Sequence, residues 1–414
     1  MRHKTVRLTL GLGGALLLAA ATACSSSSST TTAPSSSSSP TASASSASAL
    51  TGSCGTIPDI AYNDQSGLVA SLGSYAANYD GFDGTIYKSP WSTWKGLTGK
   101  IKVGILIDGL SNGFQPVLES SLESDLQAYG YSTIALVPSS ASVTDQLQGY
   151  QTLLNDGVNM IIAQAQSPTA YNSLIDKAAK EGIPTIGVLN EIADANAVNV
   201  VPNSVLGGMK LAQFVVQQAK GKGLVLFLHG IPGVPIDTDT ANGANDVLKL
   251  CPQITTNESI VTQFEASIAK QQVLSYLNTH PQPVAGVITA GPFTSGVIEA
   301  FEQAGRTVPV ITNNGLDDGG LAYWLQHEST FDGVALANTP NGLAYAASVV
   351  AHKMLIGDGV KINTLAIDPP LATSADLTQY VDVSSSWTIN SAGTAIGPPS
   401  AYVSGAYIDS IFTK

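Results

Sequence analysis

The sequence predicts an α/β protein with two doubly wound parallel-sheet lobes. From residue 102 onward, short apolar segments alternate with amphipathic segments of helical period. This alternation runs as far as residue 189 and starts again after residue 203. The 414 residues, 44% of them hydrophobic, can fill two cores of roughly 100–200 residues each. Such strand–helix alternation makes the strands parallel and covers both faces of each sheet with helices.

The N-terminus is typical of an export signal. Residues 1–23 combine a basic start, an apolar run and small residues before Cys24. The apolar run is shorter than the about 20 residues that span a bilayer. The segment Ala21-Thr22-Ala23-Cys24 resembles a bacterial lipobox, in which Cys24 becomes the lipidated N-terminus. The alternative is an ordinary secretory signal that is cut after Ala23.

Residues 24–51 are rich in Ser and Thr and contain almost nothing that could pack, so we expect a disordered tether. Residues 52–98 are irregular and are expected to form an extension packed on the body. Two cysteines remain, Cys54 and Cys251. Outside the cytoplasm they favour a disulfide, and two separately buried thiols are the alternative. The chain has no CxxC pattern and only five scattered His, so we expect neither zinc nor another cofactor.

The strands and helices of the body follow in order. The first series has strands at 102–107, 133–137, 160–163 and 185–189, with helices at 117–126, 143–154 and 170–180. The second has strands at 224–228, 260–262, 284–289 and 308–312, with helices at 205–219, 242–250, 268–277, 295–303 and 319–326. A last helix, 342–355, would pair most simply with the first lobe. Residues 375–414 have no functional interpretation.

Polar side chains follow these strands, where open parallel sheets bind their ligands. The segments after the strands include 108–112, 164–168, 190–191, 229–235, 263–265, 291–293 and 313–317. They are rich in carboxamides and poor in Arg and Lys. Each carboxamide offers a donor and an acceptor, whereas a phosphate or carboxylate ligand would call for Arg. This composition therefore favours a neutral, hydroxyl-rich ligand.

The charge balance excludes some partners. The chain has 18 Lys and Arg against 30 Asp and Glu, a net charge of -12. Nucleic acid binding needs clustered basic residues, and so does a polybasic membrane surface. Neither partner is expected.

Several ordered blocks resemble the type I periplasmic binding proteins of sugar ABC importers, in the ribose-binding-like group. They are KVGILIDGLSNGFQPVLESSLESDLQAYGY, EGIPTIGVLN, SVLGGMKLAQFVV, HGIPG, YLNTHPQPVAGVITA, VPVITNNG and VALANTPNGLA, between about residues 100 and 370. The resemblance implies two lobes joined by a three-strand hinge, with crossovers near Asn203, Asn338 and Asn363. Lobe one would comprise 99–202 and 339–363, and lobe two 203–338 and 364–414.

The resemblance also implies site residues. Asn112 and Phe114 match the positions that bond a sugar hydroxyl and stack on its face, and Gln164 matches a polar ligand after the third strand. In lobe two, Phe264, Asn314 and Asn338 match the second stacking aromatic, an Asp and a Gln. The candidate ligand-binding residues are Asn112, Phe114, Gln164, Gln166, Asn190, Glu191, Asp239, Phe264, Asn314 and Asn338.

The chain departs from the family pattern at three places. Asn190-Glu191 stands where the family commonly has Asp-Arg, Thr238 and Asp239 lie where a further Arg is missing, and Gly291 replaces an Asn. The loss of both guanidinium groups leaves the identity of the sugar open.

Some of these residues have alternative interpretations. Phe114 and Phe264 could be ordinary core residues, and Asn313-Asn314-Gly315 is a turn signal in itself. Gln164 and Gln166 alternate about Ala165, so we expect only one of them to face the ligand. Glu191 and Asp239 could form the acid pair of a glycosidase, although nothing near them in the sequence supports it.

The sequence therefore predicts a non-enzymatic, monomeric solute-binding lipoprotein on the outer face of a bacterial cell membrane. It would bind a sugar or polyol between its lobes and deliver it to an ABC permease. The alternatives are a sensory protein that presents the same ligand to a membrane receptor or kinase and, more remotely, a secreted glycan-active enzyme.

Overall fold

The computed structural model describes residues 50, 52–109, 112–140 and 142–413. They belong to one compact unit, Ser48–Lys414. The predicted signal peptide, Cys24 and nearly all of the predicted tether lie outside the described residues. Within the described part of the chain, no helix has the length and apolarity that crossing a membrane requires.

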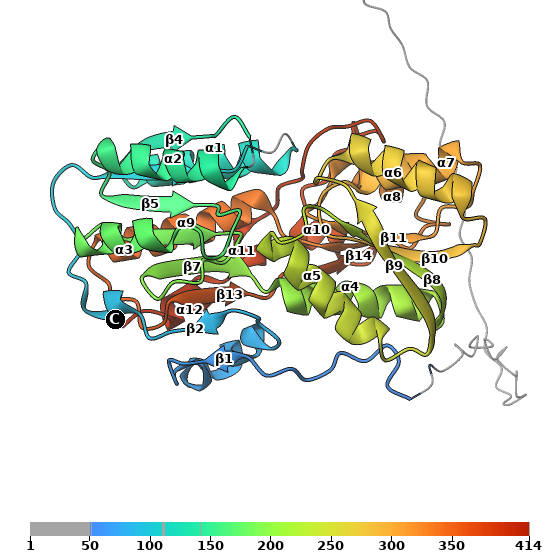
Figure 1. Ribbon diagram of the computed structural model, residues 1–414, viewed down its shortest axis with the longest axis horizontal. Coiled ribbons are helices and arrows are strands. Elements are labelled where there is room, and N and C mark those ends of the chain that lie inside the picture. Colours follow the sequence, from blue (N-terminus) through green and yellow to red (C-terminus); the bar gives the residue numbers. More distant parts are fainter. Residues whose placement is uncertain (1–49, 51, 110–111, 141, 414) are drawn as a thin grey trace, which may run out of the picture. The chain divides into compact units, whose positions relative to one another are not determined.

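Lobe one contains a six-stranded parallel sheet in the order β13-β7-β6-β5-β3-β4 (Figure 1). Its strands are β3 (Lys102–Leu106), β4 (Ser132–Leu136), β5 (Met160–Ala163), β6 (Thr185–Val188), β7 (Ala197–Pro202) and β13 (Thr364–Ile367). Its helices are α1 (Phe114–Ala128), α2 (Val143–Asn155), α3 (Asn172–Lys180) and α9 (Pro340–Leu355).

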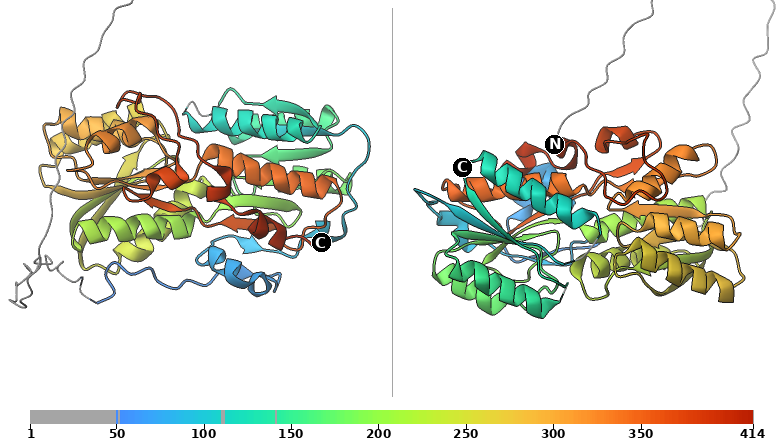
Figure 2. Two further views of the ribbon diagram at one scale, coloured as in Figure 1. Left: turned by 180° about the vertical axis from the view of Figure 1, so that it is seen from behind. Right: turned by 90° about the horizontal axis from the view of Figure 1, so that it is seen from above.

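Alternation along the central strands builds a core on each face of this sheet. In β5, Met160 and Ile162 pack in the cluster that holds the buried residues of α1 and α9, whereas Ile161 packs in the cluster that holds those of α2 and α3. Helices α1 and α9 lie side by side on their face (Figure 2). Successive strand side chains point to opposite faces, so strands buried on both faces are apolar throughout.

Lobe two contains a second six-stranded sheet in the order β14-β12-β11-β10-β8-β9, parallel except for the antiparallel edge strand β14. Its strands are β8 (Lys222–His229), β9 (Gln253–Val261), β10 (Val284–Thr289), β11 (Val310–Asn314), β12 (Val334–Leu336) and β14 (Leu371–Thr373). Its helices are α4 (Ser204–Gln218), α5 (Pro235–Leu248), α6 (Ala266–Thr279), α7 (Thr294–Gln303), α8 (Asp318–Gln326) and α10 (Leu377–Tyr380). The fold is thus the predicted pair of doubly wound lobes.

The third crossover and the C-terminal tail differ from the predicted boundaries. Residues 364–367 form β13, which pairs with β7 in lobe one, so the chain crosses at 368–370 rather than near Asn363. The tail begins in lobe two and ends in lobe one, where α11 (Pro399–Tyr402) and α12 (Gly405–Ser410) pack in the core beside α9. The resemblance to the family implied a crossover near Asn363 and so placed all of 364–414 in lobe two, and a four-residue apolar strand does not itself reveal which sheet it will join.

The N-terminal extension packs on both lobes. It contains the strands β1 (Asn63–Asp64) and β2 (Thr85–Ile86) and the 3-10 helices η1 (Val69–Tyr79) and η2 (Pro90–Thr93). Cys54 is disulfide-bonded to Cys251 in lobe two, while Val69 and Tyr79 are buried in the core of lobe one. The extension also bonds to a crossover, because Asn203 donates its side-chain amide to the carbonyl of Asn78 at 2.9 Å.

Candidate ligand-binding site

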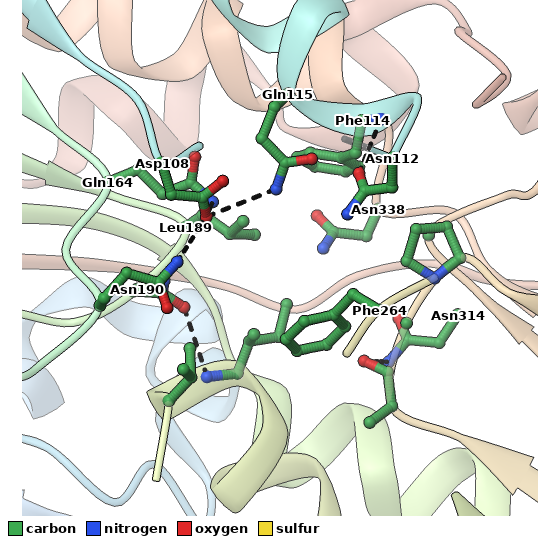
Figure 3. A pocket seen from close by; sticks show the side chains of 17 residues that line it. Asp108, Asn112, Phe114, Gln115, Gln164, Leu189, Asn190, Phe264, Asn314 and Asn338 are labelled. Atoms are coloured by element: carbon green, nitrogen blue, oxygen red, sulfur yellow. Dashed lines mark hydrogen bonds between the residues drawn. The ribbon is translucent and has the colours of Figure 1, made fainter. Parts of the chain in front are cut away.

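A pocket lies where strand ends of both lobes meet, and it encloses about 430 Å³, part of which is open to solvent. It is lined by Asp108, Asn112, Phe114, Gln115, Gln164, Gln166, Leu189, Asn190, Val234, Ile236, Phe264, Ala290, Gly291, Pro292, Asn314, Gly315 and Asn338 (Figure 3). Parallel strands bring their carboxyl ends to one edge of the sheet, so loops that are distant in sequence share the pocket.

A buried carboxylate organises the glutamines of lobe one. Because β3 pairs with β5, Asp108 after β3 lies beside Gln164 and Gln166 after β5. Both glutamine amide nitrogens donate to Asp108 Oδ2 at 2.6 Å, and Gln115 donates to the same oxygen at 3.5 Å. The amide oxygens of Gln115 and Gln164 are buried and have no hydrogen-bond partner within the protein. These two oxygens can therefore accept hydrogen bonds from a ligand.

Three of the four asparagines that line the pocket are bound by the protein through their side-chain oxygens. The side-chain oxygen of Asn112 accepts from the backbone N–H of Phe114 at 3.0 Å, and that of Asn338 accepts from the hydroxyl of Tyr402 at 2.8 Å. The oxygen of Asn190 accepts from the backbone N–H of Ile236 at 3.4 Å, a bond between the two lobes. In these three asparagines the protein binds the side-chain oxygen, and the amide nitrogen is the end that can donate to a ligand.

Two phenyl rings enter the pocket from opposite lobes. Phe114 begins α1, and Phe264 belongs to the loop between β9 and α6; both are buried. Phe264 and the preceding Gln263 have φ of 60° and 57°, a left-handed conformation that non-glycine residues seldom adopt. The Phe264 ring lies so close to Gly230 and Gly291 that an added Cβ would be 2.0 Å and 2.5 Å from ring carbons. A strained loop and two side-chain-free neighbours thus hold this ring in place.

The pocket offers hydrogen bonds without a formal positive charge. Among the described residues that line it, none is a lysine, arginine or histidine, and Asp108 is the one acidic side chain. A second negative charge in this buried space would meet a carboxylate in a medium of low dielectric. The arrangement therefore favours a neutral ligand with several hydroxyl groups.

Glu191 and Asp239, which the sequence also proposed, do not line this pocket. They lie with Asp83 in a group that we call the acidic cluster. Burial, with a contribution from Asp83, raises the pKa of Glu191 to about 7. Burial, with contributions from Asp83 and Glu191, raises the pKa of Asp239 to about 8. Each residue follows a pocket segment in sequence, but its side chain points elsewhere.

The structure brings the other eight candidates together in the pocket. The expectation that only one of Gln164 and Gln166 faces it is wrong, because β5 ends at Ala163 and the strand alternation does not extend into the loop. The sequence analysis missed Asp108 and Gln115 as site residues. The signal for Asp108 was available, since it directly follows the first predicted strand. Most of the lobe-two lining, such as Val234, Ile236 and Ala290, carried no polar signal.

Comparison with known proteins identifies the family of the chain. The family model of the periplasmic binding protein domain matches residues 103–359. The chain is 26% identical over 243 residues to the xylitol-binding protein of Mycolicibacterium smegmatis, covering 58% of this chain and 68% of that protein. It is 23% identical over 219 residues to the ribose import binding protein of Bacillus subtilis, covering 52% and 70%.

A solved structure shares the fold. The ABC transporter solute-binding protein of Mycobacterium smegmatis with bound glycerol matches with a TM-score of 0.61 and 18% identity, covering 72% of this chain and 99% of that one. The chain therefore belongs to the periplasmic binding protein domain family, as a type I periplasmic binding protein of the ribose-binding-like group.

Proposed function

We propose that this protein captures a sugar or polyol between its two lobes and delivers it to an ABC importer. The observation that carries the proposal is the pocket lining: seven carboxamide side chains and two phenyl rings come from both lobes, and none of the described residues that line the pocket is basic. Rings can cover the C–H faces of a sugar while carboxamides pair with its hydroxyls. The relatives whose names state a ligand are binding proteins for xylitol, ribose and fructose, which supports a neutral, hydroxyl-rich ligand here.

Closure of the lobes would complete the binding site. Asn190 in lobe one bonds to the backbone of Ile236 in lobe two, so a bond between the lobes is formed directly beside the pocket. Hinge closure around a ligand is a general device that removes the ligand from water. In this proposal a closed, loaded form is what the permease receives, and the protein itself catalyses no reaction.

Binding can be tested by a thermal-shift screen of neutral sugars and polyols, because a ligand that binds only the folded form raises its stability. Calorimetry with the hits should then show that Phe264→Ala and Asn112→Ala each weaken binding at least tenfold. Phe331→Ala and Asn155→Ala replace the same residue types away from the pocket and serve as matched controls. Unchanged affinity in both pocket variants would refute the proposed site.

Delivery and anchoring need separate measurements. Deletion of the gene should abolish uptake of the radiolabelled ligand; loss of a transcriptional response with uptake intact would instead indicate the sensory alternative.

The lipobox-like segment before Cys24 supports anchoring by a lipid. The Cys24→Ser variant should then leave the membrane fraction, whereas Ser25→Ala should stay in it. Membrane retention of Cys24→Ser would exclude lipidation at this residue.

A further inference from the structure

The two lobes give the pocket chemically different walls. Lobe one supplies the polar wall, formed by Asp108, Asn112, Gln115, Gln164, Gln166 and Asn190. Lobe two supplies the apolar wall, formed by Val234, Ile236, Phe264, Ala290, Gly291 and Pro292. The side chains of the apolar wall contain no oxygen or nitrogen. Phe114 and Leu189 of lobe one and Asn314 and Gly315 of lobe two also line the pocket. A ligand held between the walls therefore meets mostly hydrogen-bonding groups on one side and mostly hydrocarbon on the other.

Most backbone N–H and C=O groups described for the apolar wall already form hydrogen bonds within the protein. The N–H of Val234 donates to Ile231 at 3.2 Å, and the carbonyl of Val234 accepts from Asp237 at 3.1 Å. The N–H of Ile236 donates to the side chain of Asn190. These groups at the start of α5 are therefore already bonded within the protein.

The loop after β10 shows the same pattern. Ala290 donates its N–H to Leu228 at 3.0 Å, and its carbonyl accepts from the side-chain amide of Asn314 at 3.3 Å. The Gly291 carbonyl accepts from the N–H of Phe293 at 3.0 Å, and Pro292 has no N–H. The bond to Ala290 uses one of the two N–H donors of Asn314, the polar side chain of lobe two that lies beside this wall.

A hydroxyl group placed against the apolar wall would lose its water and gain few partners. Buried polar groups without a hydrogen bond are costly. A methyl or methylene group at the same place would gain from burial. The polar wall instead favours hydroxyl groups, because they can donate hydrogen bonds to the unpartnered amide oxygens of Gln115 and Gln164.

We propose that the ligand is a deoxy sugar, a neutral monosaccharide with a C–H-rich edge where its parent carries a hydroxyl. Its remaining hydroxyls face the polar wall, and its deoxygenated edge faces the apolar wall. This inference rests on the proposed function, because it assumes that the pocket binds a sugar. It goes further by assigning to the apolar wall the choice between a sugar and its deoxygenated counterpart.

Calorimetry on the full-length protein with matched sugar pairs tests the assignment. The pairs are L-rhamnose and L-mannose, L-fucose and L-galactose, D-fucose and D-galactose, and 2-deoxy-D-ribose and D-ribose, with xylitol as an additional probe. At least one deoxy sugar should bind at least tenfold more tightly than its parent. Equal or tighter binding of every parent, or no binding of any deoxy sugar, would overturn the inference.

The outcomes also separate this inference from the proposed function. If parents or xylitol bind but the deoxy sugars show no advantage, the protein is still a sugar- or polyol-binding protein and only the deoxy assignment fails. If no neutral sugar or polyol binds, the deoxy assignment and the proposed function fail together.

A variant of the wall gives a second test. Ala290→Ser places a hydroxyl in the apolar wall, so the preference for the deoxy sugar over its parent should fall at least fivefold. The matched control is Ala300→Ser, because Ala300 is equally buried in α7 but does not line the pocket. The control should leave the preference unchanged even if it lowers the melting temperature. An unchanged preference in Ala290→Ser would show that this wall does not select the ligand.

Discussion

Asn338 is oriented by a residue far along the chain. It lies between β12 and α9, where the chain passes from lobe two to lobe one, and its side-chain oxygen accepts from the Tyr402 hydroxyl at 2.8 Å. Tyr402 is itself buried in the core of lobe one. The C-terminal tail, for which the sequence suggested no role, thus fixes which end of the Asn338 amide can reach a ligand.

Tyr402→Phe should weaken ligand binding about fivefold, because a net hydrogen bond is worth about 1 kcal/mol. The ring is kept, so the packing of lobe one should be retained. Calorimetry should show that the effect disappears in an Asn338→Ala background, since the two residues would act through one bond. Tyr407→Phe is a suitable control, because it removes a buried tail hydroxyl that donates to Ala366 and not to the pocket. Additive effects of the Tyr402 and Asn338 variants would contradict this role.

At the scale of elements, the N-terminal extension adds a connection between the lobes. The disulfide fastens its start to lobe two, and η1 and β2 pack into the core of lobe one. The Tyr79 hydroxyl donates to the carbonyl of Thr364 in β13 at 2.7 Å. The extension is therefore bound to lobe two by a disulfide and to lobe one by packing and a hydrogen bond.

Removal of the disulfide in Cys54→Ser/Cys251→Ser should lower the free energy of unfolding by about 2–5 kcal/mol, the usual range for a native disulfide. The crosslink joins residues 197 positions apart, so it restricts a long loop of the unfolded chain. Urea denaturation under oxidising conditions measures the loss. Ligand affinity should change less than twofold, because neither cysteine lines the pocket. Unchanged stability would mean that the bond contributes nothing in solution.

At the scale of the whole molecule, the acidic cluster joins three parts of the chain. Asp83 belongs to the extension, Glu191 follows β6 in lobe one, and Asp239 lies in α5 of lobe two. Asp237 also contributes to the raised pKa of Asp239, and it is hydrogen-bonded to His229. Carboxyl groups of the extension and of both lobes therefore lie close together.

This cluster should make stability fall as pH rises. A carboxyl with a raised folded-state pKa binds extra protons in the folded state, so its stabilising contribution is full below its unfolded pKa of about 4. The contribution of Asp239 is then lost as pH rises through about 8. Asp239→Asn should therefore gain melting temperature over the parent between pH 5 and pH 8.5, as calorimetry can measure. Asp246→Asn, on the same helix and ion-paired with Lys249, is the control. A constant difference across this range would contradict the role of the cluster.

Burial decides how much of the fold can be predicted from the sequence. Strands β3, β5, β8 and β10 contain apolar runs that are readily recognised. Strand β9 was predicted as three residues but has nine, because it is an exposed edge strand with polar side chains. Strands β12, β13 and β14 were missed, because a run of three or four residues has too little pattern to separate a strand from a loop. Strand β7 was also missed, since Asn199 and Pro202 interrupt its apolar run.

The site was predictable where a polar residue follows a strand that is itself recognisable, as for Gln164 and Asn190. It was not predictable where the chain supplies a residue from elsewhere, as Tyr402 does, or where the wall is apolar, as at Ala290. Glu191 shows the converse error: it is adjacent in sequence to a pocket residue, yet its carboxylate lies against Gly84. Position next to a strand end does not fix the direction of a side chain in a loop.

The amino-acid sequence by itself determined the two parallel-sheet lobes and the neutral, carboxamide-rich character of the strand ends, because both follow from local periodicity and residue type. Only the tertiary structure decided which end of each amide faces the pocket, that lobe two contributes a hydrocarbon wall, and that the tail returns to lobe one. Those features depend on contacts between residues up to hundreds of positions apart, and no local pattern records them.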